Sequence, residues 1–150
     1  MRPTEVLKKL KELSTDINDV IKATTALGDI DAQIEYQDTP EDRFLRCEIV
    51  QVLEQLQLIA RGIEYLNRPV VAEGKLRLNH SDRYELVAED GEVIREYSSG
   101  AGIEVLIYDA DTEDYSWIKS RIEHDGERYY LYGHKDLESL GGLSARVRAV

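Results

Sequence analysis

Four carboxylates lie close together in the second half of the sequence and raise the question of a metal site. They are Asp109, Asp111, Glu113 and Asp114. Oxygen-rich loops of this kind can bind calcium, but the twelve-residue EF-hand loop also needs a central glycine and a terminal glutamate. The residues that follow, Tyr115 to Trp117, supply neither. We therefore expect a solvated acidic loop and no bound metal.

The histidines and the single cysteine do not form a catalytic pattern. The three histidines fall in or beside predicted turns, without the two-histidine spacing on one element that is typical of zinc sites; they are His80, His124 and His134. Cys47 lies on a predicted helix with no histidine near it in sequence, and a catalytic thiolate needs a neighbouring positive group. Its neighbours Arg43 and Arg46 are ordinary helix-surface charges. No nucleophile elbow or phosphate-binding glycine motif occurs, so we expect no enzyme activity and no cofactor.

Aromatic side chains are concentrated in the second half, and their alternation indicates a surface. Tyr130 and Tyr132 lie on the strand face opposite Leu131, and Trp117 lies opposite Ile118. If Leu131 and Ile118 face the core, the three rings line the outside, where Tyr and Trp are preferred at interfaces. The alternative is that these rings complete the core or cover the helices.

Beside the acidic loop, this aromatic surface would suit a basic or proline-rich peptide. The predicted partner-binding residues are Tyr108, Asp109, Asp111, Glu113, Asp114, Tyr115, Trp117, Tyr130 and Tyr132.

Two amphipathic helices are predicted to precede these residues, over about 4–27 and 40–66. Apolar residues in each follow the alternating spacing of three and four that is typical of a heptad seam: Val6, Leu10, Leu13, Ile17, Val20, Thr24 and Leu27, then Leu45, Ile49, Val52, Leu56, Ile59, Ile63 and Leu66. Gly28 suits a left-handed cap after the first helix. Thr39 and Pro40 suit the start of the second, and Pro69 ends it. The connector 29–38 could be an acidic loop or a short strand.

The two helices of the predicted hairpin, residues 1–68, must pack on a further surface besides each other. Burial of its seam alone does not offset the entropy lost in ordering about fifty residues. The apolar stripe is also wider than a seam, because Leu7, Ile21, Leu53 and Ala60 extend it. The hairpin is therefore expected to pack on its own β-domain, which we favour, on a second copy of the chain, or on a partner.

From residue 69 the apolar period changes to two, which predicts an antiparallel β-domain over 69–150. From Ile103 onward the predicted order is strand, long acidic loop, Trp-bearing strand, tight turn at Asp125-Gly126, aromatic strand, helical turn and last strand. This layout resembles an SH3-like barrel. The fold class is α+β, with an N-terminal antiparallel helical hairpin packed on or beside a C-terminal antiparallel SH3-like β-barrel.

A narrower resemblance rests on several segments. They include Leu66-Asn67-Arg68-Pro69-Val70-Val71-Ala72-Glu73-Gly74-Lys75-Leu76, Ile103-Glu104-Val105-Leu106-Ile107 and Arg121-Ile122-Glu123-His124-Asp125-Gly126. Together they resemble an uncharacterised bacterial family of small proteins that carry a domain of unknown function and often lie in mobile elements. The resemblance covers residues 66–148 and implies an accessory role without any catalytic residues.

Composition limits the remaining possibilities. Apolar residues make up 42% and charged residues 33%, as in a folded globular protein. No apolar stretch is long enough for a membrane span or signal peptide, and one cysteine permits no internal disulfide, so we expect a cytoplasmic protein without membrane contact. The net charge of −11 argues against direct nucleic-acid binding, which needs an excess of Lys and Arg. A local basic strip exists nevertheless, at Lys119, Arg121, Arg146 and Arg148.

The expected function is that of a non-catalytic interaction or accessory protein, with a protein partner that offers a basic or proline-rich surface. A homodimer through the helical hairpin is a further possibility. The alternative is an acidic anti-defence or regulatory inhibitor of a nucleic-acid enzyme, because negative charge can block a basic surface.

Overall fold

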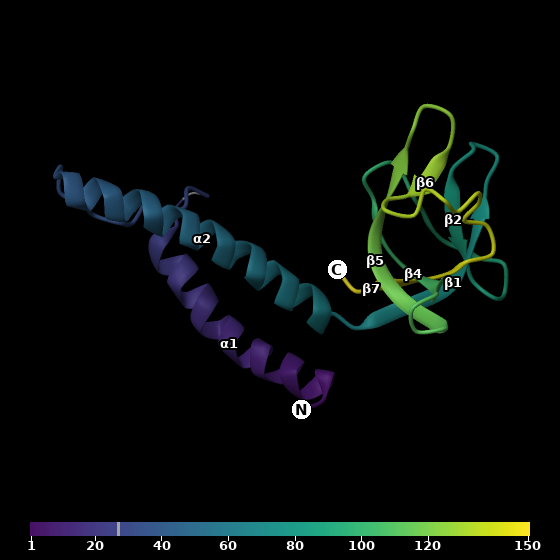
Figure 1. Cartoon of the computed structure of the whole chain (residues 1–150), viewed down its shortest axis with the longest axis horizontal. Helices are drawn as coiled ribbons and strands as arrows, with labels where there is room; N and C mark the ends of the chain where they lie inside the picture. Colours follow the sequence, from purple (N-terminus) through teal and green to yellow (C-terminus); the bar gives the residue numbers. More distant parts are fainter. Residues whose placement is uncertain (27) are drawn as a thin grey trace. The chain divides into compact units, whose positions relative to one another are not determined.

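The computed structural model describes residues 1–26 and 28–150, which divide into two compact units, Met1–Arg68 and Pro69–Val150 (Figure 1). Leu27, predicted as the last seam residue of the first helix, lies outside the described residues. The α+β fold class is confirmed: two helices pack together in the first unit, and the second unit is a seven-stranded antiparallel sheet that curls into a half-barrel. None of the described helices is long and apolar enough to cross a bilayer.

Helix α1 spans Pro3–Thr24 and α2 spans Pro40–Asn67. The start of α2 is as predicted: the Thr39 hydroxyl accepts a hydrogen bond from the backbone N–H of Asp42 (3.2 Å), and Pro40 takes the first helical position. Gly28 has a left-handed φ of +85°. It does not cap α1, however, because the helix ends four residues earlier. The Thr24 hydroxyl donates to the carbonyl of Val20 (2.9 Å), and Thr25 is extended.

The connector between the helices is a loop and contains no strand among its described residues, 28–38. Arg46 of α2 holds it, because its guanidinium pairs with Asp31 at 2.6 Å and lies 4.9 Å from the ring centre of Tyr36. The acidic connector is therefore anchored to the first turns of α2.

The helix pair buries few of its apolar side chains. Among the described residues of this unit, the buried side chains are Ile17, Leu53 and Ile63. Ile17 and Ile63 are seam residues, but most other seam positions remain half-exposed, so the buried side of the helix pair coincides with only part of the predicted heptad seam.

The sheet has the strand order β3-β2-β1-β7-β4-β5-β6. Its strands are β1 (Val70–Leu78), β2 (Tyr84–Val87), β3 (Val93–Glu96), β4 (Gly102–Asp109), β5 (Asp114–His124), β6 (Tyr129–Leu131) and β7 (Ser144–Arg148). The last strand, β7, lies between β1 and β4 and joins the two hairpin groups into one sheet. A core of side chains from all parts of the sheet fills the concave side, and Leu86, Val105, Ile122 and Leu131 are fully buried there.

Two loops differ from the prediction. The long acidic loop is a turn of residues 110–113, because β4 and β5 pair as far as Asp109 and Asp114. The predicted helical turn around Leu137 is a series of turns without a helix. Arg128 organises this segment by donating to the backbone carbonyls of Lys135, Leu137 and Glu138 at 2.6–3.0 Å. Both differences arise from contacts between residues five to ten positions apart, which the alternation of apolar residues does not specify.

Candidate functional site

The outer face of β4, β5 and β7 carries most of the predicted site. On β4, Ile103, Val105 and Ile107 point into the core, and Glu104, Leu106 and Tyr108 therefore alternate onto the opposite face. The register places a β5 partner next to each: Lys119 beside Glu104, Trp117 beside Leu106 and Tyr115 beside Tyr108. The aromatic side chains of Tyr108, Tyr115 and Trp117 thus lie in one line along the β4–β5 pair.

The aromatic pair at the end of this ladder is exposed. Tyr108 and Tyr115 are 57% and 62% exposed, and their rings meet edge to face with centroids 5.7 Å apart. Such pairs are stabilised beyond their buried area. The hairpin therefore holds two tyrosines in a fixed mutual geometry while it leaves their surfaces open.

The acidic turn next to the pair is preorganised by its own backbone. The Asp109 carboxylate accepts the N–H of Asp111 (2.9 Å), the Asp114 carboxylate accepts the N–H of Tyr115 (2.7 Å), and Glu113 adopts a left-handed φ of +53°. Among the residues that the structure describes, none of these four carboxylates forms a salt bridge with a cation of the protein. Their charge is available to a partner.

Trp117 lies farther along the same face and already contacts a cation. The Arg146 guanidinium lies 4.3 Å from the centre of its ring. Glu104, which is 5% exposed, fixes that guanidinium through contacts of 2.8 and 3.0 Å and accepts a further hydrogen bond of 2.6 Å from Arg148. Sequence reasoning missed Glu104 as a member of this site. The available signal was a carboxylate in the middle of an apolar strand, Ile103 to Ile107.

Tyr130 and Tyr132 lie away from this group. Tyr130 pairs with Glu123 of β5, six residues beyond Trp117, which corresponds to about 20 Å at the usual rise per residue. Both rings contact cations of their own: Lys135 lies 5.0 Å from the Tyr130 centroid and Arg121 lies 3.8 Å from that of Tyr132. The nine predicted residues therefore form two groups, with seven around the β4–β5 hairpin and two at β6.

The predicted basic strip is largely neutralised by carboxylates. Arg146 and Arg148 bind Glu104, and Arg121 binds Glu123. Phosphate binding draws its affinity from cations that release counterions, and these guanidiniums already have anionic partners.

Other reactive groups form no assembled centre in the part of the chain that the structure describes. No group of three or more His, Cys, Asp or Glu side chains is placed to hold a metal ion within residues 1–26 and 28–150. His124 packs edge to face on Tyr129, with ring centroids 4.5 Å apart, and its Nδ1 accepts the N–H of Gly126 (3.0 Å). Cys47 is exposed on α2.

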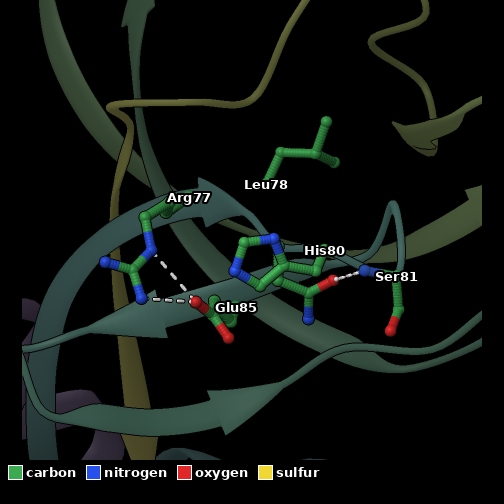
Figure 2. Close-up of a pocket in the computed structure, with 6 residues that line it drawn as sticks. Arg77, Leu78, His80, Ser81 and Glu85 are labelled. Atoms are coloured by element: carbon green, nitrogen blue, oxygen red, sulfur yellow. Dashed lines mark hydrogen bonds and ion pairs between the residues drawn. The ribbon is translucent and has the colours of Figure 1, made fainter.

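A shallow depression of about 550 Å³ opens at the end of β1 (Figure 2). Its lining includes Arg77, His80, Ser81 and Glu85. Arg77 donates twice to Glu85 (2.6 and 3.0 Å), and Asn79 accepts the backbone N–H of Ser81 (2.9 Å). Among the described residues, His80 forms no hydrogen bond with the Ser81 hydroxyl, so the depression holds no nucleophile–base pair.

The comparison with protein families matches most of the sheet. Residues 74–147 match a domain of unknown function (DUF5348). The DUF5348 segment begins at Gly74 in β1 and ends one residue before the end of β7. At Gly74 an added Cβ would lie 2.3 Å from the carbonyl oxygen of Val87. It contains every predicted site residue and neither helix. No curated protein and no solved structure matches the chain.

Proposed function

We propose that the protein is a non-catalytic interaction protein whose DUF5348 domain binds a basic segment of another protein at the end of the β4–β5 hairpin. We call this surface the hairpin site and define it by Tyr108, Asp109, Asp111, Glu113, Asp114 and Tyr115, with Trp117 at its inner edge. The role is that of an accessory factor, which the sequence resemblance associates with mobile elements.

One observation carries the proposal: within the part of the chain that the structure describes, the exposed tyrosine pair has no cation stacked on it. Trp117, Tyr130 and Tyr132 each contact an Arg or Lys of the same chain. Among the described residues, no cation lies over Tyr108 or Tyr115, and four carboxylates without a basic partner adjoin them. An Arg or Lys from a partner would find both an aromatic face and a counter-charge there.

The chemistry of this site favours a basic segment over a neutral proline-rich one. Proline-rich peptides bind grooves lined by aromatic rings, whereas Tyr108 and Tyr115 meet edge to face at a hairpin tip. The carboxylates add attraction that a neutral peptide does not use. A proline between basic residues would still be compatible with the site, since it holds the segment extended.

Selection from a random peptide library displayed on phage tests the proposal. We expect full-length protein to enrich peptides rich in Arg and Lys, and the binding to weaken as salt increases. Tyr115→Ala, and Asp111→Asn combined with Glu113→Gln, should each abolish selection. Tyr132→Ala is the matched control, because Tyr132 is a comparably exposed tyrosine on the same strand group. No enrichment, or equal loss with Tyr132→Ala, would contradict the proposal.

An inhibitor of a nucleic-acid enzyme is a second candidate, and the charge of the β-domain favours it. Residues 69–150 carry 10 basic and 17 acidic side chains, a net charge of −7. In that case the hairpin site would bind the basic nucleic-acid groove of an enzyme. Inhibition of a nuclease by full-length protein, lost when the four carboxylates of the turn are neutralised, would distinguish this role from peptide binding alone.

A further inference from the structure

Each helix of the first unit exposes a row of apolar side chains spaced by seven residues. The α1 ridge consists of Val6, Leu13 and Val20, which are 40–49% exposed. The α2 ridge consists of Leu45, Val52, Ile59 and Leu66, which are 44–54% exposed. A seven-residue repeat is the pattern by which a helix packs lengthwise against other helices. The two rows therefore indicate that other helices pack on this surface.

Both ridges lie on one face of the helix pair. At about 100° per residue, the α1 ridge is rotated by roughly 80° from the side of α1 that packs on α2, which is marked by Leu7, Ile17 and Ile21. The α2 ridge is rotated by roughly 80° in the same sense from the packed side, which is marked by Leu53, Ala60 and Ile63. Because the helices are antiparallel, rotations in the same sense turn both ridges toward the same face.

The α1 ridge is symmetric about Leu13. Val6 and Val20 each lie seven residues from it, Lys9 lies four before and Asp16 three after. When a second α1 runs antiparallel and crosses at Leu13, Val6 meets the partner's Val20. Lys9 then lies next to the partner's Asp16. The apolar row and its flanking charges thus complement themselves under a two-fold rotation.

The charge gradient along α1 favours the same pairing. Residues 2–11 carry four basic side chains and one acidic, a net charge of +3, whereas residues 12–24 carry one basic and three acidic, a net charge of −2. Antiparallel pairing places the positive half of one α1 against the negative half of the other, and parallel pairing would oppose like charges.

We propose that two copies of the chain associate through this face as a four-helix bundle, in which α1 packs antiparallel on α1 of the partner and α2 on α2. The α2 ridge spans 22 residues, with about 32 Å between Leu45 and Leu66. With two helices side by side, the face covers on the order of 600 Å² in projection, which is close to the roughly 800 Å² per partner of a specific interface. This dimer is independent of the hairpin site.

The mass of the full-length protein in solution is the first test. We expect 34.4 kDa by light scattering, which is twice the 17.2 kDa of one chain. Leu13→Glu places two carboxylates at the two-fold axis and should reduce the mass to 17.2 kDa at the same concentration. The helix itself tolerates the change because Leu13 is half-exposed. Val71→Glu, at an apolar position of β1 that is 61% exposed, is the control and should leave the dimer intact.

A charge swap tests the antiparallel pairing of α1. Lys9→Glu alone and Asp16→Lys alone should each weaken the dimer at least about tenfold, because each opposes like charges across the interface. The double variant should restore the affinity. Lys9 and Asp16 are seven residues apart in one helix, about 10 Å, so their direct interaction within the monomer is small.

A wild-type mass of 17.2 kDa at concentrations up to about 200 µM would overturn the proposal and assign the face to another occupant, such as the β-domain of the same chain or a different protein. A dimer that survives Leu13→Glu, or a double charge swap that fails to restore affinity, would also overturn it. Circular dichroism confirms that each variant remains helical. Peptide selection by the hairpin site continues in the monomeric variant, so the two proposals fail separately.

Discussion

Glu104→Gln is predicted to destabilise the β-domain strongly. The carboxylate is buried and accepts hydrogen bonds from Arg146 (2.8 and 3.0 Å) and from Arg148 (2.6 and 3.2 Å). Glutamine retains the size of the side chain, but it removes the charge and turns an amide donor toward two guanidinium donors. Removal of one member of a buried ion pair costs about 3–5 kcal/mol, because the remaining charge is uncompensated.

The exposure of Arg146 and Arg148 determines where in this range the loss of unfolding free energy lies. Their side chains retain 21% and 16% exposure, so water solvates part of the released charge, and we expect the lower end, about 3 kcal/mol. Glu85→Gln is the matched control. Glu85 is also buried, but its partner Arg77 is 56% exposed and can turn to solvent, so the expected loss is below about 1 kcal/mol.

Urea unfolding followed by tryptophan fluorescence measures both values. Trp117 is the only tryptophan and lies against Arg146, so its emission reports the state of this network. At a slope near 1 kcal/mol per molar urea, about 3 kcal/mol lowers the midpoint by about 3 M. A Glu104→Gln midpoint within about 1 M of the Glu85→Gln midpoint would refute the reasoning that Glu104 is the centre of a buried charge network.

Three further predictions concern the β-domain. Tyr97→Phe should keep or raise the free energy of unfolding, by up to about 1 kcal/mol, because the buried hydroxyl has no partner among the described residues; a loss in urea unfolding would contradict this. Gly74→Ala should cost several kcal/mol, because the new Cβ would lie 2.3 Å from the Val87 carbonyl oxygen; wild-type stability would show that β1 and β2 can separate there. Hydrogen bonds from the N–H groups of Arg128 and Glu127 lower the pKa of Asp125 to about 2. Since that value lies below the ordinary 3.8, the stability gained is present above pH 4 and is lost as the pH falls toward 2; a carboxyl pKa near 3.8 by NMR would contradict the turn geometry.

Local patterns in the sequence predicted the elements well. The spacing of three and four predicted both helices, and Thr39, Pro40 and Pro69 gave the bounds of α2 to within a residue. The same spacing did not show what each apolar residue touches. Val6, Leu13 and Val20 belong to the seam pattern, yet they remain exposed, because the buried side of the helix pair overlaps only part of that pattern.

The sequence predicted which face of a strand each side chain of the candidate site lies on. It did not predict how far apart these side chains lie, because that depends on how neighbouring strands pair. Alternation placed Trp117 opposite Ile118 and Tyr130 opposite Leu131, as observed. The distance between these rings follows from the pairing of Glu123 with Tyr130, which no local pattern specifies. The ion pair between Arg146 and Glu104 likewise depends on β7 lying beside β4, since the two residues are 42 positions apart in the sequence.

The most direct test of the interaction function is an NMR titration of full-length, ¹⁵N-labelled protein with a basic peptide from the library selection. We predict that the amide signals of residues 108–117 shift in a saturable manner, and that the Tyr108 and Tyr115 rings show contacts to Arg or Lys side chains. The signals of Tyr130 and Tyr132 should stay unchanged. Saturable shifts confined to other surfaces, or no shift at millimolar peptide, would contradict the proposed hairpin site.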